Sequence, residues 1–399
     1  MVDLKEYTII RSLKMARRIM EDRDFMKRRS LFLILTLTAA LTVAGCGKDD
    51  KSSNNSAPAP SIQVVTENPT VTTEVSQDAA APVEESREGM YRSELTNEWI
   101  DEALKDQRPI AAMVDNEKTA LPHYGLSRAD IVYEMTNSTL NDGVTRFMVL
   151  FKDYESIDQI GSIRSVRPTN LIIAPEWDAI VCHDGGPFYI DDYIAKPYLD
   201  HFSGTFSRVD NGKSREFTEY ILKGDMDKNF SNSSVSKTYT SYYKGQNHFL
   251  YAPEAQPQDL SGYADAKSAS HIQLPYKHNK PYLDYDESSQ KYLYSEYGQA
   301  HVDPGNGNQQ LAFDNVILQS ARLHKFDDNG YMMFYAMDVG KEGYYITKGK
   351  AIKIVWTKPE DACSPTKYYD ADGNEIVINT GKTYIAIIPD DIYSGLTID

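Results

Sequence analysis

Cysteine is scarce in this chain, with three residues in 399, too few for a disulfide scaffold of such length. Basic residues are also in deficit, because Lys and Arg number 42 against 58 Asp and Glu and the formal net charge is −16. Non-specific nucleic-acid binding depends on clustered cations that face phosphates, so we expect no nucleic-acid partner. The G-x-S-x-G, H-E-x-x-H, Walker-loop and paired-cysteine zinc motifs are missing too. The sequence therefore predicts neither a cofactor nor a metal, and leaves open whether the protein is an enzyme.

The N-terminal region carries the features of a bacterial export signal. Basic residues at 27–29 precede an apolar run of 14 residues, 31–44, which is too short to span a bilayer as a helix. The run ends in Leu41-Thr-Val-Ala-Gly-Cys46, whose last four residues resemble the lipobox of bacterial lipoproteins. In that family the cysteine is acylated and becomes the mature N-terminus.

This resemblance implies a signal peptide over 1–45, with translation starting at Met1 or at Met26, and lipidation at Cys46. Several acyl chains together anchor a protein stably to a bilayer. We therefore predict attachment to the extracytoplasmic face of the cell membrane. An ordinary secretory signal and a buried apolar helix are the alternatives.

The next region, 46–95, is polar and contains proline, as in Lys51-Ser-Ser-Asn-Asn-Ser56 and Ala57-Pro-Ala-Pro60. Such a composition cannot bury a hydrophobic core. We predict a disordered linker that holds the folded part away from the membrane.

Residues 96–255 predict an α/β domain. Near-continuous apolar runs, typical of strands covered on both faces, occur at 110–114, 130–135, 145–151 and 178–182. Residues 168–177 predict a helix, with Pro168 in its first turn and Ser165 as its cap. Because strands alternating with helices form layered domains, we expect a mixed sheet covered by helices.

Residues 271–397 show a different pattern, with regular strand-like runs and little helical periodicity. Turn signals such as Asp328-Asn-Gly330 and Asp370-Ala-Asp-Gly-Asn374 separate the runs. The expected strands are 291–297, 315–318, 331–335, 351–356, 375–378 and 383–388. This pattern predicts a β-rich, mostly antiparallel C-terminal domain.

Arginines stand at the ends of several predicted elements. Arg164 and Arg167 precede Pro168 and share one face if the helix begins nearby. The N–H groups and the dipole of a helix N-terminus would add to a site for phosphate or carboxylate. Arg146 opens an apolar strand, and Arg128 precedes another in the same way. A charge at the mouth of a buried strand must be paired or bind something, so the cluster is either an anionic-ligand site or an internal salt-bridge network.

Acidic residues and a histidine could complete such a site. The segment His183-Asp184-Gly-Gly186 directly follows a predicted strand, and open α/β sheets bind ligands at the carboxyl ends of their strands. A plain strand-exit turn with a satisfied histidine is the alternative. Glu134 is a further candidate partner for the arginines. The candidate ligand-binding residues are Arg128, Arg146, Arg164, Arg167, Asp115, Asp130, His183 and Asp184.

Several of these segments together resemble the YerB-like lipoprotein family, which has an N-terminal and a C-terminal domain of unknown function. The resemblance covers about 96–390 and rests on Arg108–Asn116, Gly125–Glu134, Thr145–Phe147, Ile160–Pro168, His183–Gly186, Asn315–Leu318, Pro365–Asp370 and Gly381–Ile385. The segment Asn247-His-Phe-Leu-Tyr251 departs from the Pro-His-Asn-Leu-Tyr that is usual in the family. The family implies no established activity.

A more distant likeness, in the order and type of residues, is to the LytR-CpsA-Psr envelope glycopolymer transferases. Those enzymes use arginines and acids around a polyprenyl pyrophosphate. The sequence thus predicts an extracytoplasmic lipoprotein that binds an anionic cell-envelope component or small ligand through its arginine cluster. The alternatives are an envelope glycopolymer phosphotransferase and a non-catalytic structural adaptor. Convergence of the arginines on an open cleft favours binding or transfer, whereas their burial against carboxylates favours the adaptor.

Overall fold

The computed structural model describes residues 86–244, 248–325 and 332–399. The predicted signal peptide, Cys46 and residues 46–85 of the predicted linker lie outside the described residues. The end of the predicted linker forms a strand, since β1 (Met90–Arg92) pairs with β2 (Trp99–Asp101) and the guanidinium of Arg92 stacks 4.2 Å from the centre of the Trp99 ring. Within the described ranges, no helix has the length and apolar character needed to cross a membrane.

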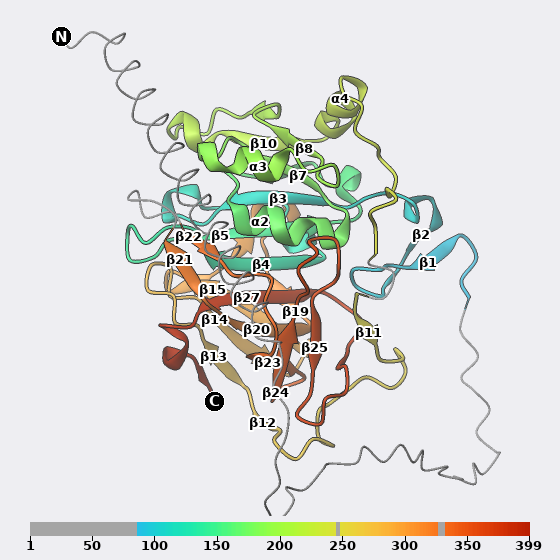
Figure 1. Ribbon diagram of the computed structural model, residues 1–399, viewed down its shortest axis with the longest axis vertical. Coiled ribbons are helices and arrows are strands. Elements are labelled where there is room, and N and C mark those ends of the chain that lie inside the picture. The colour runs from blue at the N-terminus through green and yellow to red at the C-terminus, as the bar shows by residue number, and fades with distance from the viewer. Residues whose placement is uncertain (1–85, 245–247, 326–331) are drawn as a thin grey trace, which may run out of the picture. The chain divides into compact units, whose positions relative to one another are not determined.

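A sheet of eleven strands forms the centre of the fold (Figure 1). Ten strands follow one another in space, and β25 (Lys367–Tyr369) pairs with β24 beside them. The ten are, in order, β12 (Lys267–Ser268), β24 (Lys350–Thr357), β23 (Lys341–Thr347), β20 (Asn315–Ala321), β27 (Thr383–Pro389), β4 (Ile131–Thr136), β5 (Thr145–Phe151), β3 (Ile110–Asp115), β7 (Ile180–His183) and β8 (His201–Ser203).

Strand directions in this sheet are mixed. β20, β27, β4, β3, β7 and β8 all run the same way, whereas β5 and β23 run against their neighbours. The parallel pairing of β27 with β4, from Thr383 opposite Ile131 to Ile387 opposite Met135, joins strands from the two predicted domains. The predicted boundary between 96–255 and 271–397 therefore falls within a chain segment whose two sides share one sheet.

The side chains of each central strand alternate between two cores, as the two-residue period of a strand requires. In β4, Val132 faces one core while Ile131, Tyr133 and Met135 face the other. In β27 the same alternation separates Tyr384, Ala386 and Ile388 from Ile385 and Ile387. Burial on both faces explains the near-continuous apolar runs in the sequence.

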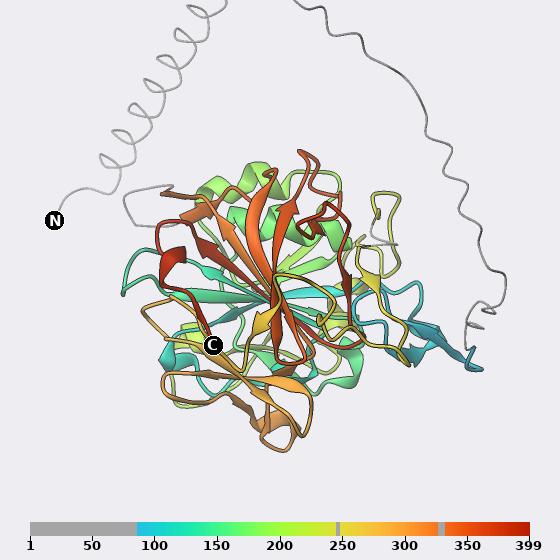
Figure 2. The ribbon, with the colours of Figure 1, turned by 90° about the horizontal axis from the view of Figure 1, so that it is seen from below.

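One core lies between the large sheet and smaller sheets (Figure 2). A six-stranded antiparallel sheet contributes Leu283, Tyr292 and Tyr294 to this core. Its strands are β13 (His271–Gln273), β14 (Tyr282–Asp286), β15 (Lys291–Glu296), β16 (Gln299–Ala300), β19 (Ala312–Phe313) and β28 (Thr397–Ile398). A second group of elements covers the same face of the large sheet. It consists of the three-stranded sheet of β6 (Gln159–Gly161), β10 (Glu219–Leu222) and β9 (Ser207–Arg208), together with α4 (Asp225–Ser231).

The opposite core lies under α2 (Pro168–Ile173), α3 (Asp191–Ile194) and irregular segments. The expectation of a sheet covered by helices is wrong, because these helices have only six and four residues and the other face is covered mainly by strands, with the seven-residue α4 beside them. Phe249, Leu260 and Phe334, from loops and the short hairpin β21 (Leu323–Lys325) and β22 (Met332–Phe334), complete the cover. The short pairs β11 (Leu250–Tyr251) with β26 (Val377–Ile378) and β17 (Val302–Asp303) with β18 (Gln309–Gln310) close the edges.

The start of α2 corrects two expectations. The helix begins at Pro168 and continues from Ala174 to Trp177 as a 3₁₀ turn, but Ser165 is not its cap. Arg167 is the capping residue, and its backbone N–H donates to Oδ1 of Asn170 at 2.9 Å. Arg164 and Arg167 therefore precede the helix in extended chain and do not share a helical face.

The predicted strands are confirmed, with shifts of a few residues at their ends. The expectation of a mostly antiparallel second region holds for the six-stranded sheet but not for β20 and β27, which are parallel. β27 lies in the middle of the large sheet, and both of its neighbours, β20 and β4, run parallel to it.

Candidate functional site

The topology separates the predicted site residues into two groups. Asp115 ends β3 and His183 ends β7, and these strands are parallel, so both residues lie at one edge of the sheet, here called the carboxyl edge. Arg146 joins them because β5 is antiparallel to β3, and Arg146 is directly opposite Asp115. Arg128 and Asp130 precede β4 and therefore lie at the opposite edge.

Asp115 is the centre of the carboxyl edge. Its Oδ2 accepts from Nε of Arg164 at 2.5 Å and lies 3.6 Å from Nη2 of Arg146. Burial alone would raise the pKa of Asp115, but the positive charges of Arg146 and Arg164 hold it below its ordinary value. The carboxylate is therefore ionised and orients both guanidinium groups.

The three arginines of this edge differ in exposure. Arg146 is buried and donates to Oδ1 of Asn137 at 3.1 Å and to the carbonyl of Ser165 at 2.8 Å. Arg167 is buried as well, and its Nη1 donates to the carbonyl of Val166. Arg164 alone of the three reaches water, with 21% of its side chain exposed, and its Nη2 donates to the exposed Glu216 at 3.0 Å.

His183 lies inside this edge and does not face solvent. Its Nδ1 is 2.8 Å from the carbonyl of Gly185 and its Nε2 is 3.0 Å from Nδ1 of His201. Burial lowers the pKa of His183 to about 4, so the ring is neutral. The two rings hold the chain as it leaves β7, which matches the alternative of a satisfied strand-exit histidine.

Asp184 belongs to an ion cluster that the sequence did not indicate. Its Oδ2 accepts from Arg208 at 2.9 Å, and the same guanidinium lies 2.5 Å from Oε2 of Glu219. Burial and the adjacent Asp184 carboxyl raise the pKa of Glu219 to about 7. Arg208 joins Arg164 at this edge through the backbone, since the N–H of Asp184 donates to the carbonyl of Arg164.

The opposite edge holds the remaining predicted residues. Arg128 is exposed and donates to Oγ of Ser156 at 3.0 Å. Asp130 accepts from the backbone N–H of Lys152, and burial of its carboxyl raises the pKa of Asp130 to about 7. The expected convergence of four arginines is therefore wrong: Arg128 is at the far end of the strands, and Arg167 and Arg146 are sealed by protein groups.

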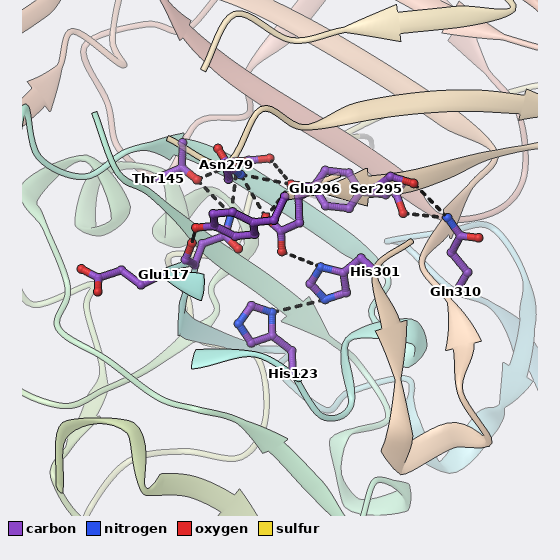
Figure 3. A network of polar contacts seen from close by, with 12 residues as sticks. Glu117, His123, Thr145, Asn279, Ser295, Glu296, His301 and Gln310 are labelled. Atoms are coloured by element: carbon purple, nitrogen blue, oxygen red, sulfur yellow. Dashed lines mark hydrogen bonds and ion pairs between the residues drawn. The ribbon is translucent and has the colours of Figure 1, made fainter. Parts of the chain in front are cut away.

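Figure 3 shows a buried polar network that was not predicted as a site and labels its members Thr145, Asn279 and Glu296. Glu134 is the main acceptor of this network. Its carboxylate, in the middle of β4, accepts from five donors: Thr145 Oγ1 at 2.7 Å, Asn279 Nδ2 at 2.7 Å, Tyr294 Oη at 2.9 Å, Tyr384 Oη at 2.6 Å and Asn116 Nδ2 at 3.3 Å. Asn279 also donates to Glu296 at 3.0 Å. In the sequence, the one indication of this network is that Glu134 is an acidic residue within an otherwise apolar strand.

The same network continues to two histidines. Oε1 of Glu296 is 2.8 Å from Nδ1 of His301, and Nε2 of His301 is 3.3 Å from Nδ1 of His123. One ligand-type atom from each of the three side chains lies within 4.8 Å of the others, and all three side chains are buried. No spacing in the sequence could have found this group, since 178 residues separate the histidines.

A second buried charge cluster surrounds Glu176. Its Oε2 accepts from Nζ of Lys358 at 2.9 Å and from both the N–H and the hydroxyl of Thr366. His248, from the segment that departs from the family pattern, stacks on Trp177 at 3.6 Å and lies 3.4 Å from Oε1 of Glu176. The glutamate, the lysine and the histidine have no exposed side-chain surface. Of this segment, His248 and Phe249 belong to the core, Leu250 is exposed, and Asn247 lies outside the described residues.

Comparisons with known proteins agree with this fold. The N-terminal domain of a protein family of unknown function, DUF3048, matches residues 95–240, and the C-terminal domain of the same family matches residues 272–385. The putative lipoprotein YerB of Bacillus subtilis (strain 168) is 26% identical over 308 residues, which cover 75% of this chain and 86% of that protein.

The crystal structure of YerB from Bacillus subtilis has the same fold, with a TM-score of 0.64 and 22% identity, over 77% of this chain and 99% of that chain. The more distant likeness to LytR-CpsA-Psr proteins is not shown by these comparisons. With both domain descriptions matched in order and a relative aligned across most of the folded region, the chain belongs to the DUF3048 family of YerB-like proteins.

Proposed function

We propose that this protein is a lipoprotein, anchored through Cys46 on the extracytoplasmic face of the membrane, that binds an anionic envelope component or small ligand at the carboxyl edge. The proposal rests on the two ion pairs of Arg164, one buried and one exposed to water. Its Nε is fixed by the buried Asp115, while its outer Nη2 donates to Glu216, whose side chain is 51% exposed. The guanidinium also lies 5.3 Å from the centre of the Phe217 ring.

Such a guanidinium is prepared to bind an anion. A carboxylate or phosphate can replace Glu216 on the outer nitrogen without disturbing the inner bond to Asp115, and charge-assisted bonds to arginine are among the stronger hydrogen bonds in proteins. The exchange costs little, because the Glu216 pair is exposed to water. Arg208, 26% exposed, lies in the nearby strand β9, where it pairs with Asp184 and Glu219, and it would provide a second cation.

The membrane anchor fits this role. The relative YerB is described as a putative lipoprotein, and the lipobox-like sequence before Cys46 supports the same attachment here. A protein held at the outer surface of the membrane meets phosphate-containing envelope components directly, which gives the proposed site a supply of anionic ligands.

Thermal-shift measurements on the purified full-length protein in detergent test the site. We expect inorganic phosphate, a sugar phosphate or a polyprenyl phosphate to raise the melting temperature of the wild type, because a ligand that binds only the folded state stabilises it by mass action. Arg164→Ala should lose most of this shift. Arg128→Ala, at the opposite edge, is the matched control and should keep it.

Identical responses of wild type and Arg164→Ala to each of the three probes would overturn the proposal. In that case the arginines of the carboxyl edge serve only to neutralise Asp115 and its neighbours.

A further inference from the structure

Two imidazole nitrogens face each other inside the folded unit. Nε2 of His301 and Nδ1 of His123 are 3.3 Å apart (Figure 3). Zinc binds histidine nitrogen at about 2.0–2.1 Å in tetrahedral sites, so two nitrogens that share one ion are about 3.3–3.4 Å apart. The two nitrogens are therefore already at the separation that a shared metal ion requires.

Glu296 determines which nitrogen of His301 is available. Its carboxylate lies 2.8 Å from Nδ1 of His301, which places the proton on Nδ1 and leaves a lone pair on Nε2, toward His123. Nδ2 of Asn279 donates to the other oxygen of this carboxylate, Oε2, at 3.0 Å. A carboxylate that orients a histidine in this way is the usual second partner of a histidine metal ligand.

Neither neutral tautomer of His123 gives both of its ring nitrogens a hydrogen-bond partner among the described residues. If Nδ1 carries the proton, it donates to Nε2 of His301, but Nε2 of His123 is then a buried acceptor without a donor. If Nε2 carries the proton instead, the lone pairs of Nδ1 of His123 and Nε2 of His301 meet at 3.3 Å. A cation between Nδ1 and Nε2 removes that repulsion.

Both histidines are held by short, well-fixed segments. Asp303, two residues after His301, accepts from the N–H groups of Gly125 and Ser127, at 3.1 Å each, just after His123. Tyr124 and Gly161 exchange two backbone hydrogen bonds on the other side. The loop bearing His123 and the turn bearing His301 are thus joined directly, which keeps the spacing of the nitrogens.

A cavity borders the pair on the side of His301. Its volume is about 250 Å³, and its lining consists of His301, Glu296, Leu121, Pro122, Gln299, Ala300 and Val302. Space of this size admits waters, which would fill the coordination positions that the protein leaves open.

We propose that His123 and His301 bind a borderline divalent transition-metal ion of the Zn²⁺ class, with Glu296 as the positioning residue for His301. Imidazole is a preferred ligand for such ions, whereas Mg²⁺ and Ca²⁺ prefer oxygen. The site shares no ligand with Arg164, so it is independent of the proposed anion site.

Metal titrations of the full-length protein, stripped with EDTA and kept in detergent, test this site. We expect Zn²⁺ to bind the wild type with a stoichiometry of one by calorimetry, and Co²⁺ to give visible absorption bands that Zn²⁺ displaces. His123→Ala and His301→Ala should each weaken binding at least 100-fold, and Glu296→Gln should weaken it about 10–100-fold.

His271→Ala is the matched control and should bind like the wild type, because His271 is an exposed histidine paired with Asp284. Circular dichroism of each variant in EDTA checks that it folds. The wild-type titration needs no variant, so a wild type that binds neither Zn²⁺ nor Co²⁺ at one per chain overturns the proposal. Binding that survives both histidine substitutions in folded variants overturns it equally.

Discussion

Replacement of Lys358 by methionine is expected to lower the free energy of unfolding by about 3–5 kcal/mol, the usual cost of breaking a buried ion pair from one side. The ammonium group lies 2.9 Å from Oε2 of Glu176, and neither side chain is exposed. Among the described residues, the substitution leaves the buried carboxylate with Thr366, Tyr133 and His248 as polar partners. Urea unfolding of the two proteins measures the difference.

Lys237→Met provides the matched control, since Lys237 forms a surface pair with Asp227 in which both side chains are about half exposed. Such pairs contribute about 0.2–1 kcal/mol. The double variant Glu176→Met/Lys358→Met should be more stable than Lys358→Met, because no charge is then left unpaired. A loss below 1 kcal/mol in Lys358→Met would show that Glu176 is neutral or that water reaches it.

Acid should reduce the effect of the Lys358 substitution. Burial alone would raise the pKa of Glu176, but Lys358 and His248 lower it well below its ordinary value of 4.5. A group whose pKa falls on folding stabilises the protein above its unfolded pKa and loses that contribution as the pH falls toward its folded pKa. Without Lys358, burial should raise the pKa of Glu176 above 4.5 in the folded variant. The difference between wild type and Lys358→Met should therefore be largest above that raised pKa and should narrow as the pH falls through it toward the lowered pKa of the wild type.

A second large loss is expected from Glu134→Ala. Five donors end on this one carboxylate. After its removal Asn279 and Tyr294 still reach Glu296 and Asn116 still reaches Thr145, but the hydroxyls of Thr145 and Tyr384 lose their acceptor. At about 1–3 kcal/mol for each buried donor left without a partner, the loss should be about 2–6 kcal/mol. Thermal and urea unfolding measure it.

Glu134→Gln distinguishes the lost acceptor from the lost volume. Burial and the neighbouring Glu296 raise the pKa of Glu134, so an uncharged side chain of the same shape should be tolerated better than alanine. Glu342→Ala, on the exposed side of β23, should change stability by no more than about 0.5 kcal/mol. Equal losses in the Gln and Ala variants would contradict the role of Glu134 as the shared acceptor.

The sequence predicted where the strands of this fold lie in the chain, but it did not predict which strands pair with one another. Runs such as 110–114 and 145–151 are apolar at nearly every position because both faces of the sheet are buried. The same property hides the pairing, since a strand buried on both sides carries little information on which strand lies next to it. That β27 pairs with β4, 252 residues earlier, follows from the tertiary fold alone.

The site predictions failed in part for a related reason. Arg128 and Arg146 each stand just before or at the opening of an apolar strand, and in the sequence they look equivalent. Because β4 and β5 are antiparallel, equivalent positions lie at opposite edges of the sheet. Asp115 with Arg146 and Arg164 was within reach of sequence reasoning, whereas the meeting of His123 with His301 depends on how two distant loops pack.

The position of β27 at the middle of the sheet has a consequence for biogenesis. This strand follows both β4 and β20 in the sequence, yet it fills the gap between them. Until β27 has been synthesised, two unpaired strand edges stay open, and open edges invite association with other chains. A polypeptide that stops before Thr383 would lack this strand, so premature termination there should yield aggregation-prone fragments instead of a shortened but working protein.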